Sequence, residues 1–370
     1  MKKLGEVVEF LDNLRRPVTE SDRKPGPYPY YGANGIQGTI DRFIFDEPLV
    51  LLAEDGGHFE DPARGIAYRI AGKTWVNNHA HVLRPRPDVD IGFVCRVLEN
   101  YDVTPFVTGT TRGKLTKAGA GEIPLPMPPL PEQRRIAAIL DQADALRAKR
   151  REALAQLDSL TQSIFIEMFG DFVANPKGFS VSLLGKVCDV RDGTHDSPKY
   201  VTDGYPLVTS KNLSGGYVDL TDVNLISEHD YDAINKRSKV DRGDLLMPMI
   251  GTIGNPVLIE HDPAYAVKNV AIVKFPKGSP SNIFIRAVLS GAYFDQVASQ
   301  KNRGGTQKFL SLGDLRSIPV PLPPPSLQHT FATRIQAVES LKATHRAALT
   351  ELHALFASLQ HRAFAGQLSA

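Results

Sequence analysis

One stretch of regularly spaced apolar residues, residues 132–169, constrains this chain more than any other feature. Within it, apolar side chains recur at alternating spacings of three and four, which is the pattern of a coiled-coil seam. The pattern lasts for about ten turns and has one polar interruption, at Arg150. We therefore expect one long helix, with a seam made of Ile136, Ile139, Ala143, Leu146, Ala153, Leu157, Leu160 and Ile164.

A second copy of this stretch lies 195 residues further along the chain and predicts a helix over residues 327–364, with a polar interruption at His345. Two long helices with matching seams most simply pack against each other, and antiparallel packing relates the halves of the chain by a pseudo-twofold axis. The coinciding residues are Leu146, Ala148, Arg151, Ala153, Leu154, Leu157, Leu160, Ser163 and Phe169 in the first copy and Leu341, Ala343, Arg346, Ala348, Leu349, Leu352, Leu355, Ser358 and Phe364 in the second. The predicted apolar side of the second helix is Phe331, Ile335, Val338, Leu341, Leu349, Leu352, Leu355 and Leu359.

The segments before the two helices are also related. Residues 184–190 resemble residues 4–10, and residues 267–274 resemble residues 76–83. The offset grows from 180 to 195, so the second segment carries about fifteen extra residues, which we expect in surface loops. In the first segment, β-rich runs between Gly, Pro, Asn and Asp clusters predict short strands and one short helix. The predicted strands are 39–45, 49–53, 66–70 and 79–83, and the helix is 91–99.

The chain therefore alternates globular units with long helices. We predict a first globular domain at 1–131, a helix at 132–169, a second globular domain at 170–326 and a helical segment at 327–370. The predicted fold class is α/β, of the mixed α+β type. In it, two homologous domains are separated by two long antiparallel helices that form a coiled-coil-like, pseudo-twofold spacer. A chain of 370 residues also exceeds what one hydrophobic core usually covers.

Composition restricts the possible partners and the compartment. The net charge is only +2, so contact with nucleic acid would depend on local basic patches and not on a cationic tail. Cys95 and Cys188 do not have zinc-ligand spacing and are expected to be buried free thiols. No apolar run approaches the ~20 residues needed to span a bilayer, and we expect a cytoplasmic protein.

Several chemical interpretations rest on weak patterns. No nucleotide-binding G-x-G-x-x-G or G-x-x-x-x-G-K-[ST] motif is present, and Asn255-Pro-Val-Leu is only superficially like the motif of amino-methyltransferases. The proline-rich stretch 123–131 is better explained as a stiff end to a domain than as a peptide ligand. One alternative is a metal site formed by His79 and His81 with Glu54, Asp55 and His58. Another is a catalytic pair in which the Cys188 thiol is the nucleophile and His195 is its base.

Basic glycine-containing loops occur at matching places before the two helices. Arg112 and Lys114 lie in the first loop, and Arg303, Gln307 and Lys308 lie in the second. Such loops suit contacts with phosphate, and two of them in one chain suit a protein that reads two half-sites of DNA. A 38-residue helix reaches about 57 Å, enough to hold two such readers about one turn of DNA apart, ~34–36 Å.

Three signatures carry a resemblance to a known family: Asp244-Leu-Leu-Met-Pro-Met-Ile-Gly-Thr-Ile-Gly254, Val76-Asn-Asn-His-Ala-His81 and Ile123-Pro-Leu-Pro-Met-Pro-Pro-Leu-Pro-Glu-Gln133. With the repeated architecture, they make nearly the whole chain resemble the specificity subunit of a type I restriction-modification enzyme. The third signature is the most specific, and its second copy departs by having Ser326-Leu-Gln328. A different cap at the start of the second helix is therefore expected.

The resemblance implies a non-catalytic subunit whose two domains each read half of a bipartite target in double-stranded DNA. It also implies that the helices set the spacer and dock two copies of a methyltransferase subunit and, through them, a restriction and motor subunit. This chain would bind no cofactor itself; S-adenosylmethionine, ATP and Mg would belong to the partners. An alternative of another class is a non-catalytic helical scaffold or inhibitor that binds proteins without reading DNA.

Residue type and loop position give candidate contacts. Long polar side chains on loops are favoured because bidentate Arg–guanine and Asn/Gln–adenine pairs discriminate bases best. The candidate DNA-binding residues are Tyr31, Asn34, Gln37, Arg112 and Lys114 in the first domain and Thr194, His195, Lys211, Asn212, Arg303, Gln307 and Lys308 in the second. The candidate partner-binding residues are Arg147, Lys149, Arg151 and Arg346.

Overall fold

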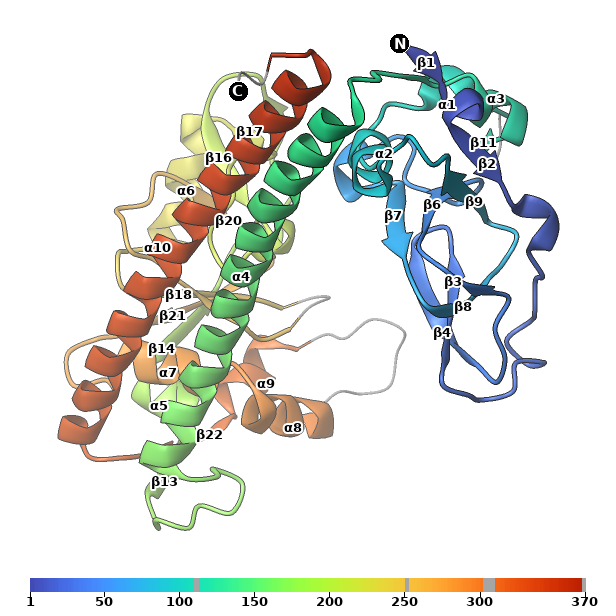
Figure 1. Cartoon of the computed structure of the whole chain (residues 1–370). Coiled ribbons are helices and arrows are strands. Elements are labelled where there is room, and N and C mark those ends of the chain that lie inside the picture. Colours follow the sequence, from blue (N-terminus) through green and yellow to red (C-terminus); the bar gives the residue numbers. More distant parts are fainter. Residues whose placement is uncertain (110–112, 250–252, 302–309, 368–370) are drawn as a thin grey trace. The chain divides into compact units, whose positions relative to one another are not determined.

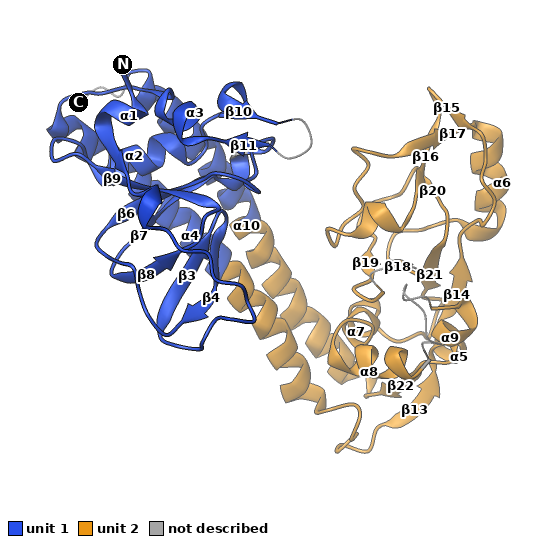
Figure 2. Ribbon diagram, turned by 90° about the vertical axis from the view of Figure 1, so that its right-hand side faces the viewer, with its two compact units in different colours: residues 1–152, 346–370 blue, residues 153–345 orange. Residues whose placement is uncertain are grey.

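The computed structural model describes residues 1–109, 113–249, 253–301 and 310–367. The chain divides into two compact units, coloured separately in Figure 2. Unit 1 contains residues 1–152 and 346–370, and unit 2 contains residues 153–345. Each unit thus consists of one globular domain, the first part of the long helix that follows it, and the last part of the other long helix.

The globular part of unit 1 is built on two four-stranded sheets, with strand orders β2-β9-β6-β7 and β4-β3-β8-β5. All pairings are antiparallel except that of β3 with β8. β6 is buried along its whole length, and the Asp90 side chain caps α2 by accepting a hydrogen bond from the backbone N–H of Phe93. The elements are β1 Lys2–Lys3, α1 Leu4–Val7, β2 Val8–Phe10, β3 Tyr28–Gly32, β4 Gly35–Ile40, β5 Phe45–Asp46, β6 Leu49–Ala53, β7 Ala67–Ile70, β8 Lys73–Val76, β9 Ala80–Pro85, α2 Ile91–Leu98, β10 Val107–Thr108, β11 Lys114–Leu115, α3 Lys117–Gly121 and β12 Pro124–Leu125.

Unit 2 repeats the first of these sheets in full and three strands of the second, in which β15 lies beside β17 whereas β5 of unit 1 lies beside β8. Its sheets have the orders β14-β21-β18-β19 and β15-β17-β16-β20, and β16 pairs in parallel with β20 as β3 does with β8. The additional residues include α6, a helix that has no counterpart between β4 and β8 in unit 1. The elements are β13 Ser180–Leu183, α5 Leu184–Val187, β14 Asp189–Asp192, β15 Tyr200–Val201, β16 Tyr205–Val208, β17 Asn224–Ile226, α6 Glu228–Ser238, β18 Leu245–Pro248, β19 Val257–Leu258, β20 Ala266–Val267, β21 Val270–Lys274, α7 Asn282–Val288, α8 Ala292–Lys301, α9 Leu312–Arg316 and β22 Pro319–Leu322.

The predicted fold class is confirmed: two homologous α/β domains alternate with two long helices. The strand predicted at 49–53 coincides with β6, and the predicted helix at 91–99 corresponds to α2. The strand predicted at 39–45 is wrong. The chain there leaves β4 at Ile40 and enters β5 at Phe45, because it bends at Asp41 and at Ile44 and forms no ladder between them.

The two long helices, α4 (Leu130–Phe169) and α10 (Pro325–Phe364), contain 40 residues each and are drawn in green and red in Figure 1. They run antiparallel, as contacts within each unit show. In unit 1 the start of α4 meets the end of α10 at Arg147 and Phe356, and in unit 2 the end of α4 meets the start of α10 at Phe165 and Phe331.

The predicted seam is correct at some levels and wrong at others. Ile136, Ala143 and Ile164 of α4 and Phe331, Ile335 and Val338 of α10 are buried, as predicted. Leu146 and Leu160 of α4 and Leu341 and Leu355 of α10 are instead 50%, 43%, 52% and 49% exposed. At these four levels the residue that turns toward the other helix is the next one along, about 100° further round. These inward residues are Arg147, Thr161, Lys342 and Phe356.

The starts of both long helices are tied to their own domains by a glutamine. Gln133 accepts a hydrogen bond from the backbone N–H of Asp90 at 2.9 Å and donates to the carbonyl of Pro128 at 2.9 Å. Gln328 makes the same pair of bonds, with the N–H of Ser281 at 2.9 Å and the carbonyl of Pro323 at 2.8 Å. The sequence difference before Gln328 thus leaves this glutamine clamp unchanged.

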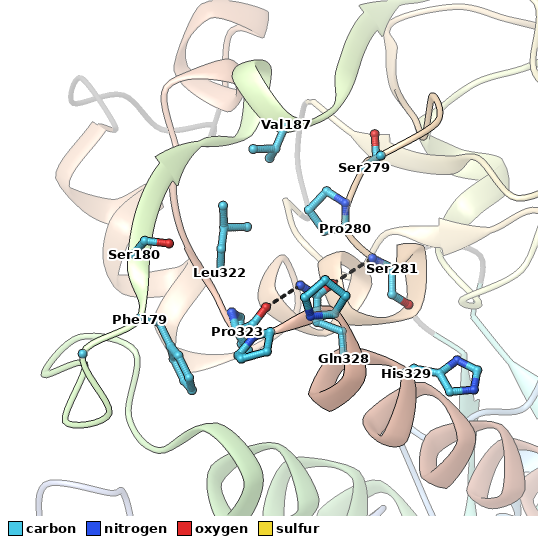
Figure 3. Close-up of a pocket in the computed structure, with 14 residues that line it drawn as sticks. Phe179, Ser180, Val187, Ser279, Pro280, Ser281, Leu322, Pro323, Gln328 and His329 are labelled. Atoms are coloured by element: carbon cyan, nitrogen blue, oxygen red, sulfur yellow. Dashed lines mark hydrogen bonds between the residues drawn. The ribbon is translucent and has the colours of Figure 1, made fainter.

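Figure 3 shows the glutamine clamp of unit 2 beside a pocket of about 700 Å³. The pocket is lined by apolar side chains and serines from 178–187, 278–281 and 322–329, including Phe179, Leu322 and His329. Both bonds of Gln328 are drawn as dashed lines in the figure. Residues from three separate segments therefore meet where α10 begins.

Candidate nucleic-acid interface

In unit 1, four of the predicted DNA-binding residues gather around the loop at residues 54–57. The exposed Asn34, on the β3–β4 turn, donates from Nδ2 to the carbonyl of Gly56 at 2.9 Å. Lys114, in β11, places Nζ 2.9 Å from Oε1 of Glu54. Gln37 accepts from the buried Asn77, whose backbone N–H in turn donates to the carbonyl of Tyr31 at 3.0 Å. The structure thus brings Tyr31, Asn34, Gln37 and Lys114 together on one edge.

A buried charge network lies beneath this edge. Nη1 of Arg15 contacts Oε2 of Glu54 at 2.5 Å, and Nδ1 of His81 contacts Oδ2 of Asp12 at 2.7 Å. Nε2 of His81 faces the carbonyl of Leu115 at 2.8 Å, in the strand that carries Lys114. The network therefore joins β9 and the segment after β2 to the base of the β10–β11 hairpin.

The carboxylates of this network have lowered pKa values. Burial alone would raise the pKa of Glu54, but hydrogen bonds from Arg15 and Lys114 outweigh it and hold the pKa below its usual range. The pKa of Asp12 is also lowered: burial opposes the shift, while the hydrogen bond with His81 and the backbone N–H of Val82 favour the charged form. Both groups are therefore anions at neutral pH.

The alternative of a metal site was based on the histidines of this region. Asp12, Glu54 and His81 do bring ligand-type atoms within 4.8 Å of one another. However, a carbonyl oxygen can only accept, so Nε2 of His81 must donate to Leu115, and Nδ1 already faces Asp12. Arg15 lies against the carboxylates in the position that a cation would occupy. The cluster fits an internally compensated ion network better than a metal site.

In unit 2, Thr194 and His195 pack beside the loop that joins β20 to β21. The N–H of Thr194 donates to the carbonyl of Val267 at 2.9 Å, and the N–H of Asn269 donates to the carbonyl of Thr194 at 3.1 Å. The His195 ring lies between Oδ1 of Asn269 and Oδ2 of Asp192, each 2.8 Å away. Both contacts favour the imidazolium and raise the pKa of His195, the Asn269 bond having the larger effect.

Two predicted residues on the following segment have different roles. Lys211 is exposed and pairs with Asp222 at 3.2 Å. Asn212 is 4% exposed, donates to the carbonyls of Asp219 and Asp222 and accepts from Thr209. All its donor and acceptor groups are therefore used inside the protein. The prediction that Asn212 contacts DNA is wrong, since its amide holds a loop in place.

The two interfaces share a backbone frame. In unit 1 the N–H of Asn77 donates to the carbonyl of Tyr31, and in unit 2 the N–H of Lys268 donates to the carbonyl of Val208, at 2.9 Å. Lys268 and Asn269 were missed as candidates, although they lie in the repeated segment 267–274 that the sequence shows. Arg112, Arg303, Gln307 and Lys308 lie outside the described residues.

Of the predicted partner-binding residues, Lys149, Arg151 and Arg346 are exposed. Arg147 lies in the seam instead, with its guanidinium 3.7 Å from the centre of the Phe356 ring and its side chain 14% exposed. The predicted polar interruption at Arg150 is half-buried, like its counterpart His345.

The thiol alternative does not fit the geometry. Cys95 and Cys188 are both buried, and burial raises the pKa of each to about 12. His195 contacts Asn269 and Asp192 with its two nitrogens and not the sulfur of Cys188. Within the described residues, none of the helices is long and apolar enough to cross a membrane.

The chain is similar to known proteins along most of its length. A family profile described as "Type I restriction modification DNA specificity domain" matches residues 1–156 and 176–354. A Haemophilus influenzae protein described as a type I restriction enzyme specificity subunit is 29% identical over 347 residues, covering 92% of this chain and 87% of the relative. The specificity subunit of the EcoBI type I restriction enzyme from Escherichia coli is 26% identical over 283 residues, covering 66% and 58%.

The fold is shared with solved structures. The S subunit of a type I restriction-modification system from M. genitalium superposes with a TM-score of 0.64 at 14% identity, covering 98% of this chain and 95% of that one. A chain from a structure of complex assembly and conformational transition in the type I R-M system superposes with a TM-score of 0.55 at 19% identity, covering 99% and 97%. At these identities the likeness shows a common fold.

Proposed function

The chain belongs to the family of type I restriction-modification DNA specificity subunits, and we propose that each of its two recognition domains reads one half of a bipartite DNA target. One observation carries this proposal. The two units have the same backbone frame, in which the N–H of Asn77 donates to the carbonyl of Tyr31 in unit 1 and the N–H of Lys268 donates to that of Val208 in unit 2. Polar side chains lie beside this frame in both units, including Asn34 in unit 1 and His195 in unit 2. Equivalent frames with different side chains suit two readers of different half-sites.

The proposed readers differ in chemistry. Unit 1 offers the amides of Asn34 and Gln37 and the cation of Lys114, whereas unit 2 offers Lys211 and the ring of His195, whose pKa is raised. Amides pair best with adenine, and cations pair with guanine or phosphate. The two half-sites should therefore differ in sequence.

We propose that the helix pair sets the spacer between the half-sites and docks two copies of a methyltransferase subunit. Each helix has 40 residues, which is about 60 Å at ~1.5 Å per residue. Exposed Lys149 and Arg151 lie within two turns of the exposed Leu146 on α4, and exposed Arg346 lies within two turns of the exposed Leu341 on α10, so both helices combine charge with an apolar surface. An internally duplicated scaffold suits two copies of one partner. A restriction and motor subunit would then join through the methyltransferase.

The proposed division of labour leaves catalysis to the partners. S-adenosylmethionine would be bound by the methyltransferase, and ATP and Mg by the restriction subunit. The loops of this chain offer hydrogen-bond donors and cations, which suit recognition, and its two thiols are buried with raised pKa values. Adenine methylation would then depend on the assembled complex.

The test is to incubate the chain and its methyltransferase subunit with a random pool of duplex DNA and to sequence the methylated molecules. We expect two short motifs at a fixed separation. Asn34→Ala should relax one motif and His195→Ala the other, while Lys186→Ala, at an exposed position on α5, should leave both unchanged. A single continuous motif, or enrichment of none, would contradict the proposal.

A further inference from the structure

The seam of the helix pair contains one well-packed cation in each unit. Arg147 of α4 and Lys342 of α10 are equivalent residues, 195 positions apart, and both replace the leucines expected to face inward. Their side chains are 14% and 6% exposed. Lysine and arginine are rarely this buried unless they are paired.

Each cation pairs with a carboxylate three residues earlier on its own helix, Asp144 or Glu339, and also has a partner on the other helix that depends on the alignment. Arg147 stacks on the face of Phe356 at 3.7 Å and places Nη2 2.6 Å from Oδ1 of Asp144. Lys342 places Nζ 2.8 Å from Oδ1 of Asp158 and donates to the hydroxyl of Thr161 at 3.3 Å. Phe356 and Thr161 are themselves equivalent residues, again 195 positions apart.

The contact of Arg147 with Phe356 and that of Lys342 with Thr161 correspond to a single alignment of α4 with α10. From Arg147 to Thr161, α4 advances by fourteen residues, and from Phe356 to Lys342, α10 goes back by fourteen. If α10 moved by one heptad in one direction, Arg147 would face Ala363 and Lys342 would face Met168. In the other direction, both cations would face leucine, at Leu349 and Leu154.

Both alternatives remove the partners on the other helix and leave each buried cation against apolar side chains, with only the carboxylate of its own helix, Asp144 or Glu339, beside it, which is unfavourable. The aromatic rings at the end of α4 also favour the observed alignment, since Phe165 and Phe169 contact Phe331. Apolar side chains, however, discriminate weakly between one apolar layer and the next. Single polar residues in a seam are the usual means of fixing register.

The alignment matters because each domain is tied to the start of a different helix. The glutamine clamp of Gln133 holds the first domain to α4, and that of Gln328 holds the second domain to α10. Each domain also contacts the other helix: Gln360 of α10 donates to the carbonyl of Arg96 at 3.0 Å, and the ring of Phe169 of α4 lies 5.2 Å from that of Phe284. Sliding one helix along the other would therefore shift one domain relative to the other and break these contacts. A slide of one heptad moves the helix by about 10 Å, which corresponds to about three base pairs at ~3.4 Å per base pair.

We propose that Arg147 and Lys342 are specificity-determining residues that hold the helix pair in one register and so restrict the enzyme to one spacer length. This inference rests on the proposed function, since it supposes two DNA readers. The register itself can be measured without DNA.

The first experiment replaces both cations with leucine and repeats the selection on random DNA. Wild type should select one spacer length. In Arg147→Leu with Lys342→Leu, the ratio of native to shifted spacers should fall by tenfold or more, the factor that corresponds to ~1.4 kcal/mol. The added spacers should differ by about three base pairs, one heptad of helix. The two half-site motifs should not change.

Two controls separate register from charge. Arg134→Leu with His361→Leu also removes two basic residues from the helices, but at exposed positions, and should keep one spacer. Arg147→Lys with Lys342→Arg preserves both cations and should keep one spacer as well. If the double leucine variant selects the single wild-type spacer with both motifs intact, the inference is overturned.

The second experiment measures register directly and also serves if the leucine variant binds DNA poorly. Spin labels at Leu146→Cys and Leu355→Cys, in a background with Cys95 and Cys188 replaced by serine, report the alignment within unit 1. We expect one narrow distance distribution with the cations present and a second population at longer distance without them, because an axial slide of about 10 Å takes labels that face each other out of level. An unchanged distribution would overturn the inference, whereas wild type that selects no bipartite motif would overturn the proposed function.

Discussion

The two recognition units keep the same frame but differ in what lies under their proposed reading edge. In unit 1 the edge rests on the buried charges of Glu54 and His81. In unit 2 the corresponding residues, by backbone pairing and offset, are Met249 and Ala271, which are 5% and 0% exposed. The N–H of Leu115 donates to the carbonyl of Glu54, as that of Leu310 does to the carbonyl of Met249.

This difference teaches which parts of the duplicated fold are free to diverge. The order of the first sheet, the parallel strand pair and the glutamine clamp that holds each domain to a helix recur in both units. The interior beneath the loops differs completely in polarity. A backbone frame can therefore be supported by an ion network or by an apolar cluster, and the side chains above it can change with the target.

Exchanging these interiors should have the largest effect. Glu54→Met leaves Arg15 and His81 without one of their two carboxylates, and Met249→Glu buries a carboxylate among apolar side chains. We expect each change to reduce the free energy of unfolding by about 3–5 kcal/mol, measured by denaturant titration. Glu20→Met, at an exposed position, should have little effect. A small loss for Glu54→Met would show that the charge network is not needed for stability.

The comparison of Glu54 with Met249 also predicts that the contribution of Glu54 to the free energy of unfolding depends on pH, whereas that of Met249 does not. Because the folded-state pKa of Glu54 is lowered, its contribution is present above the usual carboxyl value of about 4.3 and is lost as the pH falls through the lowered pKa. The difference in stability between wild type and Glu54→Met should therefore shrink in acid. A difference that stays constant from pH 7 to pH 3 would show that packing, and not charge, makes the contribution.

The glutamine clamps test a feature that the two units share, since the same two hydrogen bonds occur in both. Gln133→Leu and Gln328→Leu each remove two hydrogen bonds, one of which comes from the backbone N–H of Asp90 or Ser281. Both changes should reduce the free energy of unfolding by similar amounts, about 1–3 kcal/mol. Gln142→Leu and Gln336→Leu change exposed glutamines on the same helices and serve as controls. Unequal losses at the two clamps would show that the frame has diverged too.

Within unit 2, substitutions of the neighbouring residues Lys211 and Asn212 should have different effects, one on DNA binding and the other on stability. Asn212→Ala should lower thermal stability, because two carbonyls and the Thr209 hydroxyl lose their partner. Lys211→Ala should leave stability unchanged and reduce the dependence of DNA affinity on salt by about one unit of slope. Equal salt slopes for wild type and Lys211→Ala would remove Lys211 from the interface.

The smallest expected effect concerns His195. Its folded-state pKa is raised, so the charge and its contribution to stability are fully present below the usual value of about 6.5 and are lost as the pH rises through the raised pKa. DNA affinity measured from pH 6 to pH 9 should decrease modestly, and His195→Gln should flatten this decrease. The same slope in both proteins would assign the titration to another group.

The candidate interface was predictable only in part. Position in a loop correctly indicated Asn34, Gln37, Lys114 and His195 as side chains of two polar edges, although their contact with DNA stays a prediction. Loop position failed for Asn212, because an asparagine amide can satisfy a turn from inside as readily as it can meet a base. Loop position also did not identify Asn269, whose role depends on the contact of its side chain with the ring of His195.

The sequence by itself determined the architecture: its internal repeat implies two domains, two long helices and their antiparallel pairing. The tertiary structure alone decided which stripe of each helix is buried. Two neighbouring stripes carry apolar residues, and periodicity cannot choose between them. Arg147 and Lys342 occupy the inner stripe because a long aliphatic stem packs in the seam while its charge meets Asp144 or Asp158. The predicted leucines, such as Leu146, are left exposed.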